Sequence, residues 1–424
     1  MRIAVLTGLF PVMWETPFLN QITGLIEQGH EVDIYADEAQ RGVPAHPDID
    51  RLGLLKRTYY PPPQLRQDGR WHQAVKLIRS HRGPDRHILL RTLNPLLFWR
   101  RAFSLDQLRR TAPFLPVRSY DICYCPFGQD ARKALRLRRL GALTGKLVVA
   151  FRGSDLCRYV SQRGSRAYRK VFRAGDLFLP VCEEFARRMI QLGCPNSRVK
   201  VHHTGINLRR FPYRPRRARS GQPLRLVSVG RLVEKKGIEY AINAVAQLSR
   251  EGLDVTYEVV GDGPLQPDLQ RRVAQMELAS RVRLVGWRTH TQVREALDGA
   301  DILLAPCVRA SDGDEEGIPN VLREGMAVGV PVISTFHSGI PELVTDGLNG
   351  YLVPERDSVA LGDRIRHLAR SPVLWLPLTN EARRTVAEDD IEALNDRFVA
   401  LLHGVIRPTA APAASRSSSF LFAR

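Results

Sequence analysis

Short apolar runs alternate with longer amphipathic stretches along most of the chain, a pattern that predicts parallel α/β structure. The runs predicted as buried strands in the first half are Ile3–Leu6, Glu31–Ala36, Asp121–Cys125, Lys146–Phe151 and Leu177–Val181. Those in the second half are Leu224–Gly230, Val255–Gly261, Val282–Gly286, Ile302–Ala305 and Pro331–Ser334. Helical spacing predicts helices between them, including Gly237–Arg250, Pro264–Met276 and Pro319–Ala327. We therefore expect two doubly wound parallel sheets.

The chain has 424 residues, which favours two domains over a single core. Residues 208–223 are rich in Pro and Arg and lack an apolar period, so they predict a solvated linker. The linker would join a first domain, residues 1–207, to a second domain, residues 224–390. Residues 391–406 have helical apolar spacing, and the Pro/Ala/Ser-rich residues 407–424 predict a disordered tail.

Residues 51–118 do not follow the strand–helix pattern. They mix basic residues with aromatic ones, namely Tyr59, Tyr60, Trp71, Phe98, Trp99 and Phe103. This composition suits the interfacial zone of an anionic bilayer, and it equally suits a helical insertion packed on the sheet. The two interpretations are compatible. No uncharged apolar run of about 18 residues is present, so we expect no membrane-spanning helix.

The first residues of the chain and its cysteines both indicate the cellular compartment of the protein. The apolar stretch 3–14 could imitate a signal peptide, but Glu15 follows it and there is no small-x-small cleavage site. We interpret the stretch as a buried strand and a loop. The six cysteines, at positions 123, 125, 157, 182, 194 and 307, form no Cys-x-x-Cys pair and suit a reducing compartment. The sequence therefore predicts a cytoplasmic protein.

The net charge of +19 is unevenly distributed. Residues 1–50 carry −6, residues 51–200 carry +23, residues 201–250 carry +9, and residues 251–400 carry −10. A basic first half is consistent with nucleic acid, an anionic membrane surface or an anionic substrate as partner. An arginine-rich solvated surface without a partner is the alternative explanation of the excess.

Two carboxylates eight positions apart are the strongest local signal. Glu316 precedes a Gly-x-Pro turn, and Glu324 falls in the second turn of the following predicted helix. Both can face one cleft at the carboxyl edge of the sheet, where doubly wound folds bind ligands. Carboxylates there can accept hydrogen bonds from sugar hydroxyls, and the helix N-terminus can hold a phosphate. An acidic helix start stabilised by the helix dipole is the alternative.

The stretch Val229–Gly237 carries two cations between a predicted strand and a helix. Arg231 follows the strand, and Lys236 directly precedes the helix. A guanidinium fork, an ammonium group and a helix N-terminus that converge on one spot favour a diphosphate. We expect the neighbouring Lys235 to be solvated.

Three other signals are weaker. Gly261, in Gly-Asp-Gly-Pro, and Gly8 each follow a strand, where a glycine lets the backbone approach an anion, although either could simply form a tight turn. Asp312 and Asp314 could hold a cation, but no further ligands accompany them. We therefore expect no metal.

Taken together, these stretches resemble the family 4 glycosyltransferases of the GT-B fold, in which two Rossmann-like domains face each other across a cleft. The resemblance covers residues 1–405. Its most specific part is the Glu316-to-Glu324 motif, followed by GRLVEKKG and HSGIPELVTDGLNGYLVP. The stretches ETPFLNQI, SDGDEEGIP and STFHSGIPELV are similar to the exopolysaccharide enzymes of the colanic acid and amylovoran type.

The resemblance implies a retaining transfer from a nucleotide-diphosphate sugar with neither a metal nor another cofactor. It implies that Arg231 and Lys236 hold the diphosphate, that Glu316 faces the donor sugar, and that Glu324 binds the ribose. The backbone of Gly317, Ile318, Pro319 and Asn320 would approach the phosphates. The first domain would bind the acceptor, and the helix 391–405 would cross back onto it.

The chain departs from the family pattern at two places. Many relatives carry His in a His-Gly-x-Asp stretch, where this chain has Arg152. This change puts a donor-sugar contact in doubt, although Arg152 could hold an anionic group instead. A second family His, in His-Phe-Gly, is replaced by Pro126, which puts the acceptor contacts in doubt.

The favoured hypothesis is a hexosyltransferase that uses a UDP- or GDP-sugar to extend a lipid-linked repeat unit of an exopolysaccharide at an anionic membrane surface. A sugar-nucleotide epimerase of the same architecture is the alternative, and a phosphorylase would need a cofactor environment that the sequence does not indicate. A nucleic-acid binder is favoured only by the net charge, because no recognised binding motif is present, so we expect no nucleic-acid partner.

Overall fold

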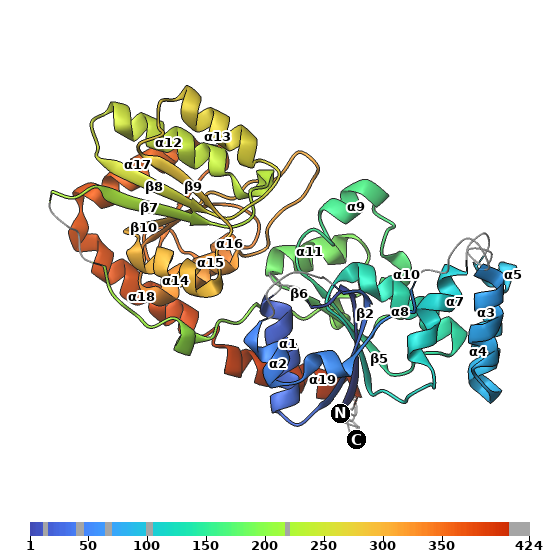
Figure 1. Cartoon of the computed structure of the whole chain (residues 1–424). Coiled ribbons are helices and arrows are strands. Elements are labelled where there is room, and N and C mark those ends of the chain that lie inside the picture. Colours follow the sequence, from blue (N-terminus) through green and yellow to red (C-terminus); the bar gives the residue numbers. More distant parts are fainter. Residues whose placement is uncertain (12–15, 40–45, 64–69, 99–104, 217–220, 407–424) are drawn as a thin grey trace, which may run out of the picture.

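The computed structural model describes residues 1–11, 16–39, 46–63, 70–98, 105–216 and 221–406. Two six-stranded sheets, each flanked by helices, form the first and second domains (Figure 1). The first sheet consists of β1 (Arg2–Leu9), β2 (Glu31–Glu38), β3 (Thr58–Tyr59), β4 (Ile122–Cys125), β5 (Lys146–Phe151) and β6 (Leu177–Pro180). The second consists of β7 (Leu224–Val229), β8 (Val255–Val260), β9 (Val282–Gly286), β10 (Ile302–Ala305), β11 (Val332–Thr335) and β12 (Tyr351–Val353).

All neighbouring strands pair in parallel, in the orders β3-β2-β1-β4-β5-β6 and β12-β11-β10-β7-β8-β9. The prediction of two doubly wound parallel sheets is confirmed. Strands β4 and β10, at the centres of the two sheets, are buried along their whole length, as expected for parallel strands covered on both faces. In the second sheet successive strands are added on one side of β7 up to β9 and then on its other side from β10 onwards. Such a switch point, here between β7 and β10, leaves a crevice at the carboxyl ends of the strands.

Helices connect the strands in both domains. In the first domain they are α1 (Thr16–Glu27), α2 (Pro47–Arg51), α3 (Arg70–Arg79), α4 (Gly83–Arg91), α5 (Pro95–Phe98), α7 (Asp106–Thr111), α8 (Gly128–Leu140), α9 (Arg158–Arg163), α10 (Arg169–Ala174) and α11 (Glu183–Gln191). In the second half of the chain they are α12 (Ile238–Arg250), α13 (Gln266–Gln275), α14 (His290–Gly299), α15 (Asn320–Val328), α16 (Ile340–Leu343), α17 (Ser358–Arg370), α18 (Trp375–Ala387) and α19 (Ile391–Ile406).

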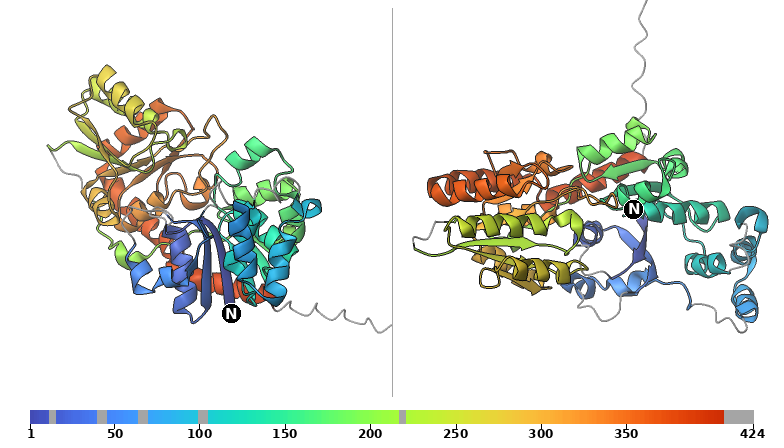
Figure 2. Two further views of the ribbon diagram at one scale, coloured as in Figure 1. Left: turned by 45° about the vertical axis from the view of Figure 1, so that its right-hand side comes forward. Right: turned by 90° about the horizontal axis from the view of Figure 1, so that it is seen from above.

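The structure adds two edge strands that the sequence pattern does not predict. Strands β3 and β12 have only two and three residues, too few to show an alternation. Between β3 and β4 the chain forms a helical insertion, α3 to α7, at the end of the first domain away from the second (Figure 2). The insertion has a small core of its own: Ala74, Ile78, Leu89, Leu105 and Leu108. Two of its predicted interfacial aromatics, Trp99 and Phe103, lie outside the described residues.

The segment 208–216 differs from the solvated linker that its composition predicts. The guanidinium of Arg216 donates to the carbonyl oxygens of Ala300 and Leu297, and the hydroxyl of Tyr213 donates to Asn380. Arginine has five N–H donors, so it can bind backbone carbonyls that no apolar pattern reveals. This part of the connection is therefore held against the second domain; residues 217–220 are outside the described part.

Helix α19 returns from the second domain and packs on the first (Figure 1). Its Phe398 and Leu402 are fully buried in a core formed with β1, β2, β4 and α1. The ring of Phe398 lies 5.2 Å from that of Tyr124. Because this helix bridges both domains, it ties their relative position to the packing of one apolar face. The predicted disordered tail, residues 407–424, and residues 12–15 of the predicted N-terminal loop lie outside the described residues.

All six cysteines are buried and free. None of the helices in the described part of the chain combines the length and apolar character needed to cross a bilayer.

Candidate functional site

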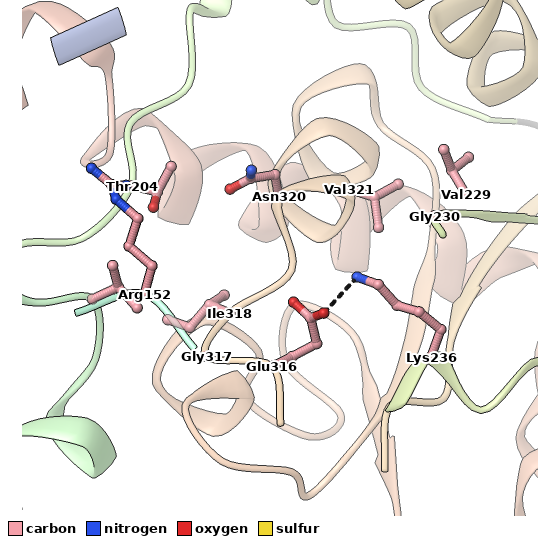
Figure 3. A pocket seen from close by; sticks show the side chains of 11 residues that line it. Arg152, Thr204, Val229, Gly230, Lys236, Glu316, Gly317, Ile318, Asn320 and Val321 are labelled. Carbon is pink, nitrogen blue, oxygen red and sulfur yellow. Dashed lines mark ion pairs between the residues drawn. The ribbon is translucent and has the colours of Figure 1, made fainter. Parts of the chain in front are cut away.

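A cavity of about 270 Å³ lies between the two domains, at the carboxyl ends of β7 and β10 (Figure 3). The first domain lines the cavity with Arg152, Val181 and Thr204. The second domain lines it with Val229, Gly230, Lys236, Glu316, Gly317, Ile318, Asn320 and Val321. The cavity therefore lies at the switch point of the second sheet, beside the N-terminus of α15.

Two glycines shape the second-domain side of the cavity. Gly237 has a φ of 62°, and a Cβ there would lie 1.9 Å from the carbonyl oxygen of Pro306. Only glycine fits this position, which turns the chain from Lys236 into α12. A Cβ on Gly261 would lie 1.9 Å from the carbonyl oxygen of Gly230. Gly261 does not line the cavity itself; it allows the turn after β8 to pack against the turn after β7.

An ion-pair cluster forms the floor of the cavity. Glu316 lies 3.1 Å from the ammonium of Lys236 and 3.2 Å from that of Lys235. Lys235 also lies 3.2 Å from Asp314. Burial opposes the ionisation of Glu316, but Lys236 and Lys235 outweigh it and lower its pKa to about 2. Glu316 is therefore ionised at any physiological pH, and Lys235 is not the solvated residue that the sequence predicted.

The loop that carries Glu316 is held by a histidine. The Nε2 of His337 accepts the backbone N–H of Glu316 at 3.2 Å, and its Nδ1 lies 2.6 Å from Glu355. Since Nε2 accepts, the proton is on Nδ1 and is donated to the carboxylate. The backbone position of Glu316 thus depends on a histidine from the HSGIPELV stretch.

Glu324 occupies a different environment from Glu316. It lies on α15 and does not line the cavity, although Lys236 acts on its charge. Burial raises the pKa of its carboxyl to about 7, and Lys236 offsets only part of this effect. Among the described residues, no ion pair or hydrogen bond partner holds Glu324. The two carboxylates of the motif therefore differ in charge near neutral pH.

The structure does not bring every predicted residue into the cavity. Arg231 is exposed and does not line the cavity, and its guanidinium has no partner among the described residues. Gly8 is the last but one residue of β1, a Cβ there would meet no atom within 4 Å, and Gly8 too is absent from the lining. Pro319 directly precedes α15 and lies against a second, smaller hollow. Arg152, Gly317, Ile318 and Asn320 do line the cavity, together with Lys236 and Glu316.

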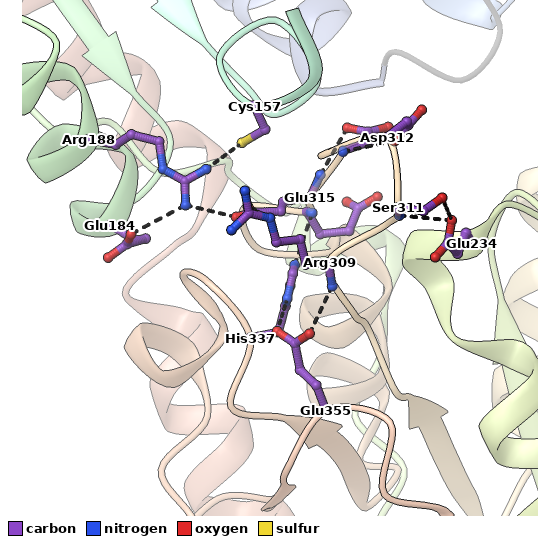
Figure 4. A network of polar contacts seen from close by, with 12 residues as sticks. Cys157, Glu184, Arg188, Glu234, Arg309, Ser311, Asp312, Glu315, His337 and Glu355 are labelled. Atoms are coloured by element: carbon purple, nitrogen blue, oxygen red, sulfur yellow. Dashed lines mark hydrogen bonds and ion pairs between the residues drawn. The ribbon is translucent and has the colours of Figure 1, made fainter. Parts of the chain in front are cut away.

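Polar contacts beside the cavity join the domains (Figure 4). Arg188 of α11 lies 2.9 Å from Glu315, and Arg158 lies 2.9 Å from Asp312. Glu342 accepts the backbone N–H groups of Glu183 and Glu184 at the N-terminus of α11. The acidic pair Asp312 and Asp314 therefore serves ion pairs with arginine and lysine.

Thr204 and Val181 line the cavity without having been singled out from the sequence. Val181 belongs to a predicted strand, and Thr204 follows the buried His202 in the segment after β6. No local pattern marks either residue, because their role arises only when the second domain approaches. A Cβ on Gly317 would lie 2.8 Å from the side chain of Val181, so this approach depends on a glycine.

Two family models match the chain. Residues 15–210 match the model described as Glycosyltransferase Family 4, and residues 223–371 match the model described as Glycosyl transferases group 1. WcaL of Salmonella typhimurium, named for a glycosyltransferase role in colanic acid biosynthesis, is 35% identical over 410 residues, 96% of this chain and 100% of the relative. The amylovoran biosynthesis glycosyltransferase AmsK of Erwinia amylovora is 34% identical over 91% of this chain and 95% of its own length.

Solved structures share the fold. Anabaena HepE in complex with UDP-glucose superimposes with a TM-score of 0.69 and 17% identity, covering 95% of this chain and all of that one. A sucrose-phosphate synthase from Thermosynechococcus elongatus superimposes with a TM-score of 0.68 and 17% identity, covering 96% of this chain and 99% of that one.

The two carboxylates predict opposite pH behaviour of paired variants. The folded chain holds the proton of Glu324 up to about pH 7, whereas the unfolded chain releases it at about pH 4.5. The stability that this proton contributes is complete below about pH 4.5 and is lost as the pH rises towards 7. The free energy of unfolding of Glu324→Gln minus that of the wild type should therefore increase by about 1–3 kcal/mol between pH 5.5 and pH 8.5. The pKa of Glu316 is lowered to about 2, so its ionised form stabilises the fold throughout this interval. Glu316→Gln should be less stable by an amount that does not change with pH. Denaturant unfolding at several pH values measures both, and a flat Glu324→Gln difference would contradict the assignment.

Proposed function

The chain belongs to the GT-B glycosyltransferases of the colanic acid and amylovoran type, and on that premise we propose that it moves a hexose from a UDP- or GDP-sugar to a lipid-linked saccharide in exopolysaccharide biosynthesis. One observation carries this proposal: Lys236, Glu316 and the N-terminus of α15 meet in one cavity that both domains line. The epimerase alternative is not favoured, because relatives that match nearly the whole chain are named as glycosyltransferases.

The donor would lie across this cavity with its diphosphate at Lys236. Negative charge grows on the diphosphate as the glycosidic bond breaks, and the ammonium of Lys236 and the dipole of α15 would stabilise it. Arg231 is next to the lining Gly230, and its guanidinium has no partner among the described residues, so it can turn towards the phosphates. Together these groups would make the reaction independent of a metal.

Glu316 and Glu324 would bind the hydroxyl-rich ends of the donor. The carboxylate of Glu316 is ionised and accepts hydrogen bonds, which suits the hydroxyls of the transferred sugar. Glu324 lies one helical turn deeper on α15, on the ribose side of Lys236 in this proposal. No nucleophile is required if the acceptor attacks from the face of the leaving group and the phosphate takes its proton, and this route retains the anomeric configuration.

The helical insertion of the first domain provides a surface for a membrane-bound acceptor. Trp71 and Val75 are about half exposed on α3, Leu90 is exposed on α4, and Leu96 on α5 is 94% exposed. Residues 70–98 carry six arginines and lysines against the single acidic residue Asp85. Exposed apolar side chains surrounded by cations match the interfacial zone of an anionic bilayer. We propose that this face holds the enzyme at such a surface.

Removal of the ammonium at position 236 should weaken both sugar transfer and nucleotide binding. In Lys236→Ala, transfer should fall by about 10²–10³-fold, because a preorganised charge at the leaving group is lost. Binding of UDP or GDP, screened by thermal shift, should weaken in parallel. The exposed Arg271, on α13, offers a control: Arg271→Ala should leave both unchanged. An unchanged turnover of Lys236→Ala would remove the diphosphate role.

The anomeric outcome tests the geometry of attack. We expect the product of an α-linked donor to carry an α-linkage, as read by NMR of the transferred sugar immediately after reaction. An inverted linkage would rule out attack from the leaving-group face.

Membrane association should depend on both charge and apolar side chains. The protein should bind phosphatidylserine-containing vesicles more strongly than phosphatidylcholine vesicles, and this binding should weaken when salt rises from about 0.05 M to about 0.5 M. Trp71→Ala should reduce binding, whereas Val373→Ala, which removes an exposed apolar residue of the second domain, should not. Vesicle binding that does not change with salt concentration would contradict the electrostatic contribution to membrane association.

A further inference from the structure

Arg152 is the one lining residue of the cavity that brings a positive charge from the first domain. It follows β5 and is held by neutral acceptors. Its Nε donates to the carbonyl oxygen of Pro126 at 3.1 Å, and its Nη2 donates to Gln21 at 2.5 Å and lies 3.3 Å from the hydroxyl of Tyr124. Helix α1 and the end of β4 with the residue that follows it thus fix the guanidinium, and no described residue accepts a hydrogen bond from its Nη1.

The other charges of the cavity are already balanced. Lys235 and Lys236 face the carboxylates of Glu316 and Asp314 in one cluster. Arg152 has no carboxylate within ion-pair distance among the described residues. The nearby Asp155 is buried, and its carboxylate accepts the backbone N–H groups of Gly128, Arg152 and Gly153 instead. A part-buried guanidinium with unused N–H donors and no counter-ion is costly unless a ligand supplies an anion.

The position of Arg152 separates it from the proposed diphosphate site. Figure 3 shows Arg152 beside Thr204 on one side of the cavity and Lys236 on the opposite side. A substrate whose diphosphate is bound at Lys236 therefore reaches Arg152 with another part, near the bond that is broken. That part is the transferred sugar or the acceptor sugar that attacks it.

We propose that Arg152 binds the carboxylate of an acidic sugar, so that the enzyme acts on a saccharide bearing a uronic acid or an equivalent acid group. The inference rests on the proposed function and adds to it the chemical class of the substrate. The two unused N–H groups of Nη1 can donate charge-assisted hydrogen bonds to a carboxylate, and the immobilisation of the guanidinium by Pro126 and Gln21 lowers the cost of binding. The carboxylate comes either from the donor sugar or from the acceptor.

Calorimetry on the full chain tests the donor source. UDP and GDP first identify the base, and the neutral and acidic donors with that base are then compared: UDP-glucose with UDP-glucuronate, or GDP-mannose with GDP-mannuronate. The wild type should bind the acidic donor about 10- to 100-fold more tightly, the range expected for a hydrogen bond to a charged group. Arg152→Gln should lose this preference while it binds the free nucleotide as the wild type does, and Arg152→Lys should keep part of the preference.

Saturation-transfer NMR tests the acceptor source. With the nucleotide site saturated, methyl glucuronide should give a stronger signal than methyl glucoside, and Arg152→Gln should remove the difference. The exposed Arg163 of the same domain supplies the matched control, Arg163→Gln. A preference in either arm that depends on Arg152 supports the inference and names the source.

Three results would overturn the inference. If neither arm shows a preference in the wild type, the acidic-sugar specificity is wrong even though nucleotide binding stands. If Arg152→Gln weakens the free nucleotide as much as the donor, Arg152 binds the diphosphate instead. If neither UDP nor GDP binds the wild type, the proposed donor site fails, and this inference fails with it.

Discussion

The balance of charge at the bottom of the interdomain cavity is the constraint on which the site depends. Glu316 can remain ionised while buried only because two ammonium groups lie within 3.2 Å of it. The same lysines are held in place by that carboxylate and by Asp314. An ion cluster of this kind positions Lys236 and Glu316 before any substrate arrives, so little reorganisation is required when charge develops on a leaving group.

The cavity exists because backbone and side chains from both domains meet at close range. Gly317 leaves room for Val181, and a Cβ on Gly339 would lie 2.6 Å from the Cβ of Cys182. Glu342 accepts two N–H groups at the start of α11, where a carboxylate also interacts favourably with the helix dipole. Helix α19 returns to the first domain and packs in its core, which holds the two domains together away from the cavity. These contacts place a first-domain guanidinium opposite a second-domain ammonium.

The two sides of the cavity have different electrostatic roles. The second domain presents charges that compensate one another and a helix N-terminus, an arrangement suited to a phosphate that arrives with its own charge. The first domain presents Arg152, whose guanidinium donates only to neutral groups among the described residues. A site with this asymmetry can bind the common part of a donor on one side and discriminate among sugars on the other. The exposed apolar and basic face of the insertion lies away from this cavity, at the end of the first domain (Figure 2).

The sequence by itself determined the two parallel sheets and singled out Lys236 and Glu316, which the structure brings together, because these signals depend on local features. Strand and helix periodicity and the glycine between Lys236 and α12 are readable within a few residues. Only the tertiary structure decided which side chains share one environment. Lys235 is half-buried against Asp314, about 80 positions away, the side chain of Arg231 is left exposed, and the half-buried carboxyl of Glu324 has no partner among the described residues. Thr204 and Arg152 enter the cavity only because the two domains close over it. Burial and the charges of distant residues set these outcomes, and neither is encoded in the spacing of neighbours along the chain.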